Sequence, residues 1–396
     1  MNPKQFMLIA GEASGDLLAA ELVSALCDAL AANPQSAIRN PQFFGAGGPR
    51  MAAAGVELAF DLTQHAVIGM SDVLKNYFKF RRLFNQLLEL AIKRQPDAII
   101  GVDYGGFNLR FGHAIKQYVR NNRSASTPWN PKIVQFVSPQ VWASRPGRAN
   151  RLAADYDLLL SIFPFEKDWY AQRVPKLRVE FVGHPMVGRF VSVGTRCSAS
   201  EDARQRVPTI LLLPGSRADE LRRHLPVMLR TLKLIREKLP SATAKMVLPD
   251  EALKQLADKL SVLPSDAEIK IGNLPQALTQ ADVAIASTGT VTMECAFFGV
   301  PTVTLYKTSW LTYQIAKRIV TVNSLTMPNL LAGEEIFSEF VQDAATPDHI
   351  AGAALELLQN EPRRNQIKKR LADVVSSLGG PGANTRAAAA ILSLFN

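Results

Sequence analysis

The sequence predicts an α/β protein with two doubly wound domains, each with a parallel sheet between layers of helices. Short, continuous apolar runs such as 98–102 and 209–213 alternate with helical patterns, as is typical of strands buried on both faces. Several runs end in glycine-containing turns, which is where doubly wound sheets bind ligands. The length of 396 residues, 47% of them hydrophobic, favours two cores over one.

The domain limits follow from composition. Residues 190–208 are rich in Ser, Gly, Arg and Asp with little periodicity, which indicates a linker. We therefore expect an N-terminal domain over residues 1–190 and a second domain over 207–374. The tail contains two or three helices, and its last segment, about 375–396, is free to pack back on the first domain.

The charge balance favours anionic partners. The net charge is +10, with 45 basic and 35 acidic residues, which suits phosphorylated substrates, acidic lipid or nucleic acid. Nucleic acid is disfavoured, because the basic residues are not interleaved with aromatic ones on one face of a strand and no reader motif occurs. The three cysteines lack metal-ligand spacing, which indicates a reducing compartment. No signal peptide or membrane-spanning stretch is apparent.

Two strand ends in the N-terminal half carry candidate site residues. A strand over 6–10 leads into a polar, glycine-containing turn and then a helix over 17–30, without the lysine of a Walker loop or a GxGxxG fingerprint. A strand over 98–102 ends at Asp103, where a carboxylate faces a ligand and can act as a general base. A role for Asp103 as a helix cap is equally compatible. The candidates in the first turn are Glu12, Ser14, Gly15 and Asp16.

The second half carries candidate phosphate ligands. Ser216 and Arg217 follow the strand over 209–213, which places the guanidinium beside a helix start. The strand over 283–286 is followed by hydroxyl residues suited to capping a helix and by a glycine that admits a ligand. Glu294, one turn further, suits ribose hydroxyls. On this stretch alone, a capped βαβ unit with an outward Glu294 is favoured. The turn residues are Ser287, Thr288, Gly289 and Thr290.

Residues 61–95 combine apolar and basic side chains. Helical spacing usually means a helix packed on a sheet, whereas apolar residues flanked by cations also suit a membrane interface. The apolar set is wider than one core stripe, so we expect a mixture of both. The membrane-facing candidates are Val67, Ile68, Met70, Val73, Leu74, Tyr77, Phe78, Arg81 and Arg82.

Two further features are less informative. The stretch 155–157 has the Asp-x-Asp pattern of metal-dependent sugar transferases, but it precedes its strand, which is the wrong end for a ligand. His184 is as compatible with a structural role as with a catalytic one.

The motifs occur in an order that resembles lipid A disaccharide synthases, glycosyltransferases with two Rossmann-like domains facing a cleft (the GT-B fold). The resemblance covers residues 6 to about 335. The motifs are Gly11-Glu12-Ala13-Ser14-Gly15-Asp16, Gly45-Ala46-Gly47-Gly48-Pro49, Ser138-Pro139-Gln140-Val141-Trp142-Ala143, Phe163-Pro164-Phe165-Glu166, Val182-Gly183-His184-Pro185, Leu213-Pro214-Gly215-Ser216-Arg217, Ser287-Thr288-Gly289-Thr290 with Glu294, and Pro328-Asn329-Leu330-Leu331-Ala332-Gly333.

The resemblance implies an inverting, metal-free transfer that joins UDP-2,3-diacylglucosamine to 2,3-diacylglucosamine 1-phosphate and releases UDP. It implies that Asp103 is the base, that Arg217 and the 287–290 turn hold the diphosphate, and that Glu294 binds ribose. Asn329 and the 12–16 turn would line the cleft. Family enzymes are peripheral on the cytoplasmic face of the inner membrane, where the 66–84 segment would meet anionic lipid. A homodimer is left open.

The sequence departs from the family pattern at a few positions. Gly105 replaces the usual proline two residues after Asp103, which predicts a more flexible loop. Ser144 and Gly188 stand where the family often has tryptophan and an acidic residue, and residues 120–132 resemble an insertion. The alternatives are a UDP-N-acetylglucosamine 2-epimerase, a peptidoglycan transferase, or a non-catalytic, membrane-associated UDP-sugar-binding protein.

Overall fold

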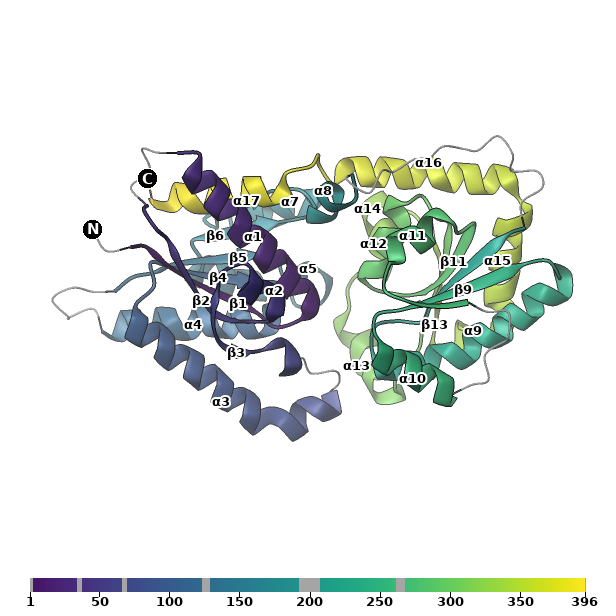
Figure 1. Cartoon of the computed structure of the whole chain (residues 1–396), viewed down its shortest axis with the longest axis horizontal. Helices are drawn as coiled ribbons and strands as arrows, with labels where there is room; N and C mark the ends of the chain where they lie inside the picture. Colours follow the sequence, from purple (N-terminus) through teal and green to yellow (C-terminus); the bar gives the residue numbers. More distant parts are fainter. Residues whose placement is uncertain are drawn as a thin grey trace. The chain divides into compact units, whose positions relative to one another are not determined.

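The computed structural model describes residues 3–33, 38–65, 70–122, 129–191, 207–260 and 268–395, with side chains from 65 to 77 and at 191 left out. The chain divides into two compact units (Figure 1). Unit 1 comprises Met1–Gly188 and Leu378–Asn396, and unit 2 comprises Arg189–Ser377. Each unit has one parallel sheet with helices packed against it, so the predicted α/β class is confirmed. The expected linker lies largely outside the described residues.

The sheet of unit 1 has seven strands in the order β3-β2-β1-β4-β5-β6-β7. The central strand β4 is buried along its whole length, as its uninterrupted apolar sequence predicted. The strands are β1 (Gln5–Ala10), β2 (Gln42–Gly47), β3 (Glu57–Asp61), β4 (Ala98–Val102), β5 (Lys132–Phe136), β6 (Leu158–Ser161) and β7 (Val179–Phe181).

Helices of unit 1 follow the strands, and one comes from the end of the chain. Helices α1 and α17 lie side by side (Figure 1), and the ring of Phe395 packs edge-on against that of Phe6, 5.7 Å between centroids. Helix α8 crosses into unit 2. The helices are α1 (Ala13–Ala31), α2 (Pro49–Ala53), α3 (Met70–Arg94), α4 (Gly105–Asn121), α5 (Val141–Ser144), α6 (Arg148–Asp155), α7 (Pro164–Arg173), α8 (Pro185–Val191) and α17 (Ala383–Leu392).

The sheet of unit 2 has six strands in the order β10-β9-β8-β11-β12-β13. They are β8 (Thr209–Leu213), β9 (Thr243–Leu248), β10 (Glu268–Ile271), β11 (Val283–Ser287), β12 (Thr302–Tyr306) and β13 (Ser338–Val341). The helices are α9 (Ala218–Lys238), α10 (Glu251–Leu260), α11 (Leu274–Thr279), α12 (Thr290–Phe297), α13 (Trp310–Ile319), α14 (Met327–Ala332), α15 (Pro347–Gln359) and α16 (Glu361–Ser377).

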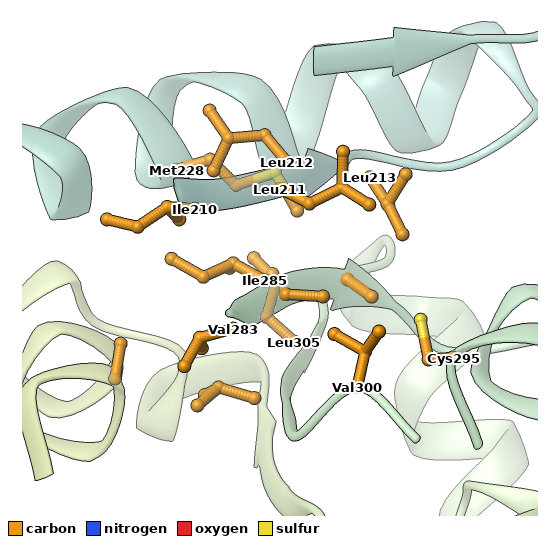
Figure 2. Close-up of a cluster of buried hydrophobic side chains, with 14 of the residues drawn as sticks. Ile210, Leu211, Leu212, Leu213, Met228, Val283, Ile285, Cys295, Val300 and Leu305 are labelled. Carbon is orange, nitrogen blue, oxygen red and sulfur yellow. The ribbon is translucent and has the colours of Figure 1, made fainter. Parts of the chain in front are cut away.

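The core of unit 2 is built on β8 and β11. Figure 2 shows Ile210 to Leu213 of β8 with Ile285 of the neighbouring strand, and all are at most 4% exposed. Apolar side chains on both faces of these strands remove a large apolar area from water, which is the main stabilising term of the unit. The loops that follow β8 and β11 therefore begin at well-packed, rigid strand ends.

The structure differs from the sequence prediction in two kinds of places. Strands β3 and β13 were missed because they lie at sheet edges and carry Glu and Asp residues that weaken the strand pattern. Helix α1 begins at Ala13 instead of Leu17, so Ser14, Gly15 and Asp16 belong to its first turn. Within the described residues, none of the helices is both long and apolar enough to cross a membrane.

Candidate functional site

Both sheets place candidate residues where the strand order reverses. In unit 1, the chain adds β2 and β3 on one side of β1 and then returns to add β4 on the other, with Ala10 paired to Val102. In unit 2, β8 and β11 are related in the same way, with Leu213 paired to Ala286. The carboxyl ends of such adjacent strands diverge into opposite layers and leave a crevice for ligands.

Asp103 lies in an unusual backbone turn between β4 and α4. Asp103 and Tyr104 both have left-handed dihedral angles, with φ of 51° and 45°, a conformation that costs on the order of 1 kcal/mol for each such residue. The carbonyl oxygen of Asp103 accepts hydrogen bonds from Gln135 Nε2 (2.8 Å) and Asn108 Nδ2 (2.9 Å). Its N–H donates to the carbonyl of Phe136 at 2.8 Å. These bonds fix the turn and hence the direction of the carboxylate.

The carboxylate of Asp103 faces the first turn of α1. Burial raises its pKa and the charge of Glu12 adds to this, while hydrogen bonds from the Tyr104 N–H and the Ser14 hydroxyl act against it. A Cβ on Gly15 would lie 3.5 Å from the Cβ of Asp103, so these two segments are in close approach. A carboxylate with a raised pKa is a stronger base than one in water.

Glycines flank this turn for steric reasons. The Tyr104 ring lies over Gly11, where a Cβ would come within 2.3 Å of Tyr104 Cδ1. Gly105 begins α4, and a Cβ there would come within 2.7 Å of Pro139 Cβ. The loop containing Pro139 therefore packs closely on residue 105, which restricts the flexibility expected from a glycine at this position.

The side chain of Asp16 is held by backbone groups of a neighbouring segment. Its side chain is 2% exposed, and its carboxylate accepts hydrogen bonds from the N–H groups of Gly48 (2.8 Å), Arg50 (3.0 Å) and Met51 (3.0 Å). These donors are at the start of α2, so Asp16 caps that helix from α1. The Asp16 carboxylate is therefore occupied within unit 1, and its expected place in the cleft stays a prediction. Glu12 is half-buried and Ser14 is exposed.

Arg217 is presented by a tight turn at the end of β8. Its side chain is 46% exposed and forms an ion pair with Glu220 at 3.6 Å. Gly215 has a φ of 121°, and a Cβ there would overlap Glu220 Oε2; the Glu220 carboxylate accepts the Ser216 N–H at 3.2 Å. Glu220 thus occupies the start of α9, and the half-exposed guanidinium of Arg217 is the cationic group of this turn that suits an anion.

A buried histidine joins this turn to the loop after β12, and the sequence analysis missed it. His224 is fully buried, with Nδ1 2.8 Å from the carbonyl oxygen of Pro214 and Nε2 accepting the Lys307 N–H at 3.0 Å. Burial lowers the pKa of His224, so the ring is neutral and Nδ1 carries the proton. The Tyr306 hydroxyl interacts with Glu220 and Arg217, and burial raises the pKa of Tyr306. Tyr306 could have been found from the sequence, because it is the last residue of the apolar strand 302–306, where ligand-facing residues of such sheets lie.

The start of α12 is open at the backbone. Gly289 is the N-cap with a φ of 138°, and no side chain caps the helix. The predicted hydroxyl caps are therefore wrong: the Ser287 hydroxyl is buried and donates to the carbonyl of Thr288, 3.1 Å away. Thr290 and Gly289 are exposed and Thr288 is half-buried, and a Cβ on Gly289 would have no neighbour within 4 Å among the described residues. The helix ends at Phe297, and Gly299 follows its C-cap with a φ of 65°.

Glu294 and Asn329 have different surroundings. Burial raises the pKa of Glu294 to about 7, and the charge of Arg189 works against that shift. Asn329 is 1% exposed: Nδ2 donates to the carbonyl of Phe337 and to Glu339, and Oδ1 accepts the N–H of Ile336 and of Phe337. These bonds hold α14 against the segment that leads into β13, and the expected place of Asn329 among the ligand-binding residues stays a prediction.

The Asp-x-Asp stretch is committed to structural contacts. Asp155 is 1% exposed, and its carboxylate lies 2.7 Å from Nδ1 of His113. Asp157 accepts a hydrogen bond from the Ile133 N–H at 2.8 Å and forms an ion pair with Lys116. Among the described residues, no cluster of three or more acidic, His or Cys side chains is arranged for a metal. The His184 Nδ1 accepts the Met186 N–H at 3.2 Å.

The apolar and basic segment divides along α3. Leu87 and Ala91 are fully buried, and the Phe84 ring packs edge-on against Phe107 at 5.3 Å, as a core helix requires. Phe78 is 79% exposed, and the next turn is also exposed at Arg81 and Arg82. Val67 and Ile68 lie outside the described residues, and the side chains of Met70, Val73, Leu74 and Tyr77 are not described.

Two doubly wound units with ligand-suited turns at both reversal points define a protein of the GT-B class. The structure is similar to a putative UDP-N-acetylglucosamine 2-epimerase from Listeria monocytogenes, with a TM-score of 0.60 and 15% identity over 100% of this chain and 97% of that one. It is similar to the glycotransferase of kitacinnamycin, with a TM-score of 0.60 and 18% identity over 100% of both chains. At these identities, the similarity shows the fold alone.

The sequence comparison is more specific. The family described as Lipid-A-disaccharide synthetase matches residues 6–393. A lipid-A-disaccharide synthase from Trichlorobacter lovleyi is 37% identical, covering 99% of this chain and 98% of its own length. One from Geobacter metallireducens is 33% identical, covering 99% and 97%. The chain therefore belongs to the lipid-A-disaccharide synthase family of glycosyltransferases, and the resemblance seen in the motifs is confirmed.

Proposed function

We propose that the protein transfers a 2,3-diacylglucosamine unit from UDP to the 6-hydroxyl of 2,3-diacylglucosamine 1-phosphate. The products are the β-1′,6-linked disaccharide 1-phosphate and UDP. The observation that carries the proposal is the Asp103 carboxylate, held in a fixed turn at the reversal point of unit 1 in a chain of this family.

The chemistry assigns one role to each unit. The Asp103 carboxylate takes the proton of the acceptor hydroxyl. At the same time, the oxygen of that hydroxyl bonds to the anomeric carbon of the donor, whose configuration is inverted. The bond from that carbon to the UDP oxygen breaks, and its electron pair stays on the diphosphate. Arg217 and the open start of α12 stabilise that charge, and Glu294 accepts hydrogen bonds from ribose. We propose that no metal is required, since Arg217 and the α12 amides supply the positive charge.

We propose further that the 66–84 segment holds the enzyme on the cytoplasmic face of the inner membrane. The support is the exposure of Phe78, 79%, beside exposed Arg81 and Arg82. An aromatic ring inserted among lipid headgroups and cations near anionic lipid both favour such binding. Substrates with acyl chains are supplied from that surface.

The test is turnover of the two diacyl substrates by the purified protein in detergent, with EDTA present. We expect disaccharide 1-phosphate and UDP in equal amounts. We expect no product when the donor is replaced by UDP-N-acetylglucosamine, which lacks the 3-linked acyl chain. UDP binding without disaccharide formation would contradict the transfer. Loss of activity with EDTA, restored by a divalent cation, would contradict the metal-free mechanism alone.

A further inference from the structure

Helix α13 of unit 2 exposes apolar side chains. None of its residues is buried. Trp310 is 72% exposed, Leu311 61% and Ile315 37%, and the following segment exposes Val320 and Leu325. These five are among only nine large apolar side chains that are exposed in the described part of the chain. Such a concentration marks an interaction surface, because single exposed apolar residues are usually scattered.

The exposed residues of α13 form one face with its cations. At 3.6 residues per turn, Trp310, Leu311, Ile315, Lys317 and Arg318 fall within about half of the helix circumference. Lys317 and Arg318 are exposed, and no acidic residue occurs from 295 to 333. We call these five side chains the α13 surface. Its apolar residues and its positive charges both face outward from unit 2.

We propose that the α13 surface binds a bilayer that contains anionic lipid. Indole rings favour the boundary between headgroups and acyl chains, and cations beside them gain from the negative surface potential. The same charges disfavour pairing of this surface with a second copy of the chain, because a symmetric contact would bring four cations together. The occupant that fits both features is therefore a lipid surface.

This contact is separate from the one proposed for the 66–84 segment. The segment belongs to unit 1, whereas α13 belongs to unit 2 and is marked in Figure 1. The α13 proposal does not depend on the transfer reaction, because vesicle binding is measured without substrates. Failure of the α13 test would leave the proposed transfer and the role of Phe78 intact.

The experiment is sedimentation of the full-length protein with vesicles of phosphatidylcholine, with or without phosphatidylglycerol. Lys317→Glu with Arg318→Glu should weaken binding to the anionic vesicles by about tenfold or more, and Trp310→Ser with Leu311→Ser should also weaken it. Matched controls are Lys368→Glu with Lys369→Glu on α16, and Leu260→Ser with Ile271→Ser, which are also exposed. The controls should bind as the unaltered protein does.

A direct readout comes from Trp310, because Trp129 and Trp169 are half-buried and Trp142 is 8% exposed. Brominated lipid should quench tryptophan fluorescence of the unaltered protein, and Trp310→Phe should lose that quenching yet keep binding. Equal binding by all variants, or equal quenching with Trp310→Phe, would overturn the proposal. So would variants that change only the oligomeric state measured by light scattering. Thermal melting of each variant verifies that it is folded.

Discussion

Asp103 and Gly289 occupy corresponding places in the two units, each following a central strand at the reversal point, but their backbones solve different problems. Asp103 and Tyr104 adopt left-handed angles without being glycine, and Gln135 and Asn108 hold them there. Gly289 has a φ of 138°, which glycine adopts without strain. It is exposed, and no side chain caps the helix that it begins. A base needs one fixed direction, whereas an anion site needs accessible N–H groups.

The largest expected effect concerns the base. Asp103→Asn keeps the shape of the side chain but cannot accept the proton of the acceptor hydroxyl. We expect turnover to fall by ~10²–10⁴-fold, while the affinity for UDP, measured by calorimetry, stays unchanged. An equal loss of UDP binding would show that Asp103 supports the structure instead.

Asp16 is the matched control for this comparison, since it is an aspartate in the neighbouring turn. Asp16→Asn weakens the cap on α2 and should lower the stability by about 1 kcal/mol, measured by chemical denaturation. The folded variant should retain most of its turnover, because its carboxylate is occupied by backbone N–H groups. A loss of turnover as large as that of Asp103→Asn would break the distinction.

The second effect tests the open anion site. Arg217→Ala removes a charge-assisted contact worth about 1.5–3 kcal/mol, so the affinity for UDP should fall about 10- to 150-fold. Arg222→Ala, in the helix that follows Arg217 and 53% exposed, is the control and should leave UDP binding unchanged. Unaltered affinity after Arg217→Ala would exclude Arg217 as a phosphate ligand.

The third effect tests whether the fixed turn matters. Gln135→Leu removes a donor to the Asp103 carbonyl, and the turn then depends on Asn108. We expect about a tenfold loss of kcat with unchanged UDP affinity. The pH profile of kcat/KM should shift with it, because the surroundings of the Asp103 carboxylate change. A variant that is less stable but has an unchanged kcat and pH profile would assign Gln135 to packing alone.

The sequence predicted the strand ends at which the candidate residues lie, but not the hydrogen bonds that hold those residues in place. Strand ends such as Asp103 and Arg217 could be located because a buried apolar run stops at a polar residue. The roles of Asp16 and Asn329 could not be told from their motifs, since the deciding partners come from residues 48–51 and 336–339. Similarly, His224 finds its partner at Lys307, 83 residues away, and only the folded sheet brings them together.

The smallest expected effect concerns the charge of Glu294. Burial raises its pKa to about 7, so the side chain of the unliganded protein can take up or release a proton near neutral pH. Ribose hydroxyls donate hydrogen bonds to Glu294 and favour its ionised form, so binding of UDP should lower the pKa of Glu294 and release protons. The affinity for UDP should therefore rise by a few-fold as the pH rises through 7.

Calorimetry in buffers of different ionisation enthalpy measures the protons released. Because UDP itself titrates near this range, the informative quantity is the difference from Glu294→Gln, which keeps the size of the side chain and cannot titrate. Identical proton release by the two proteins would show that Glu294 does not meet the nucleotide, and the open α12 start would then bind the diphosphate without a ribose contact from this helix.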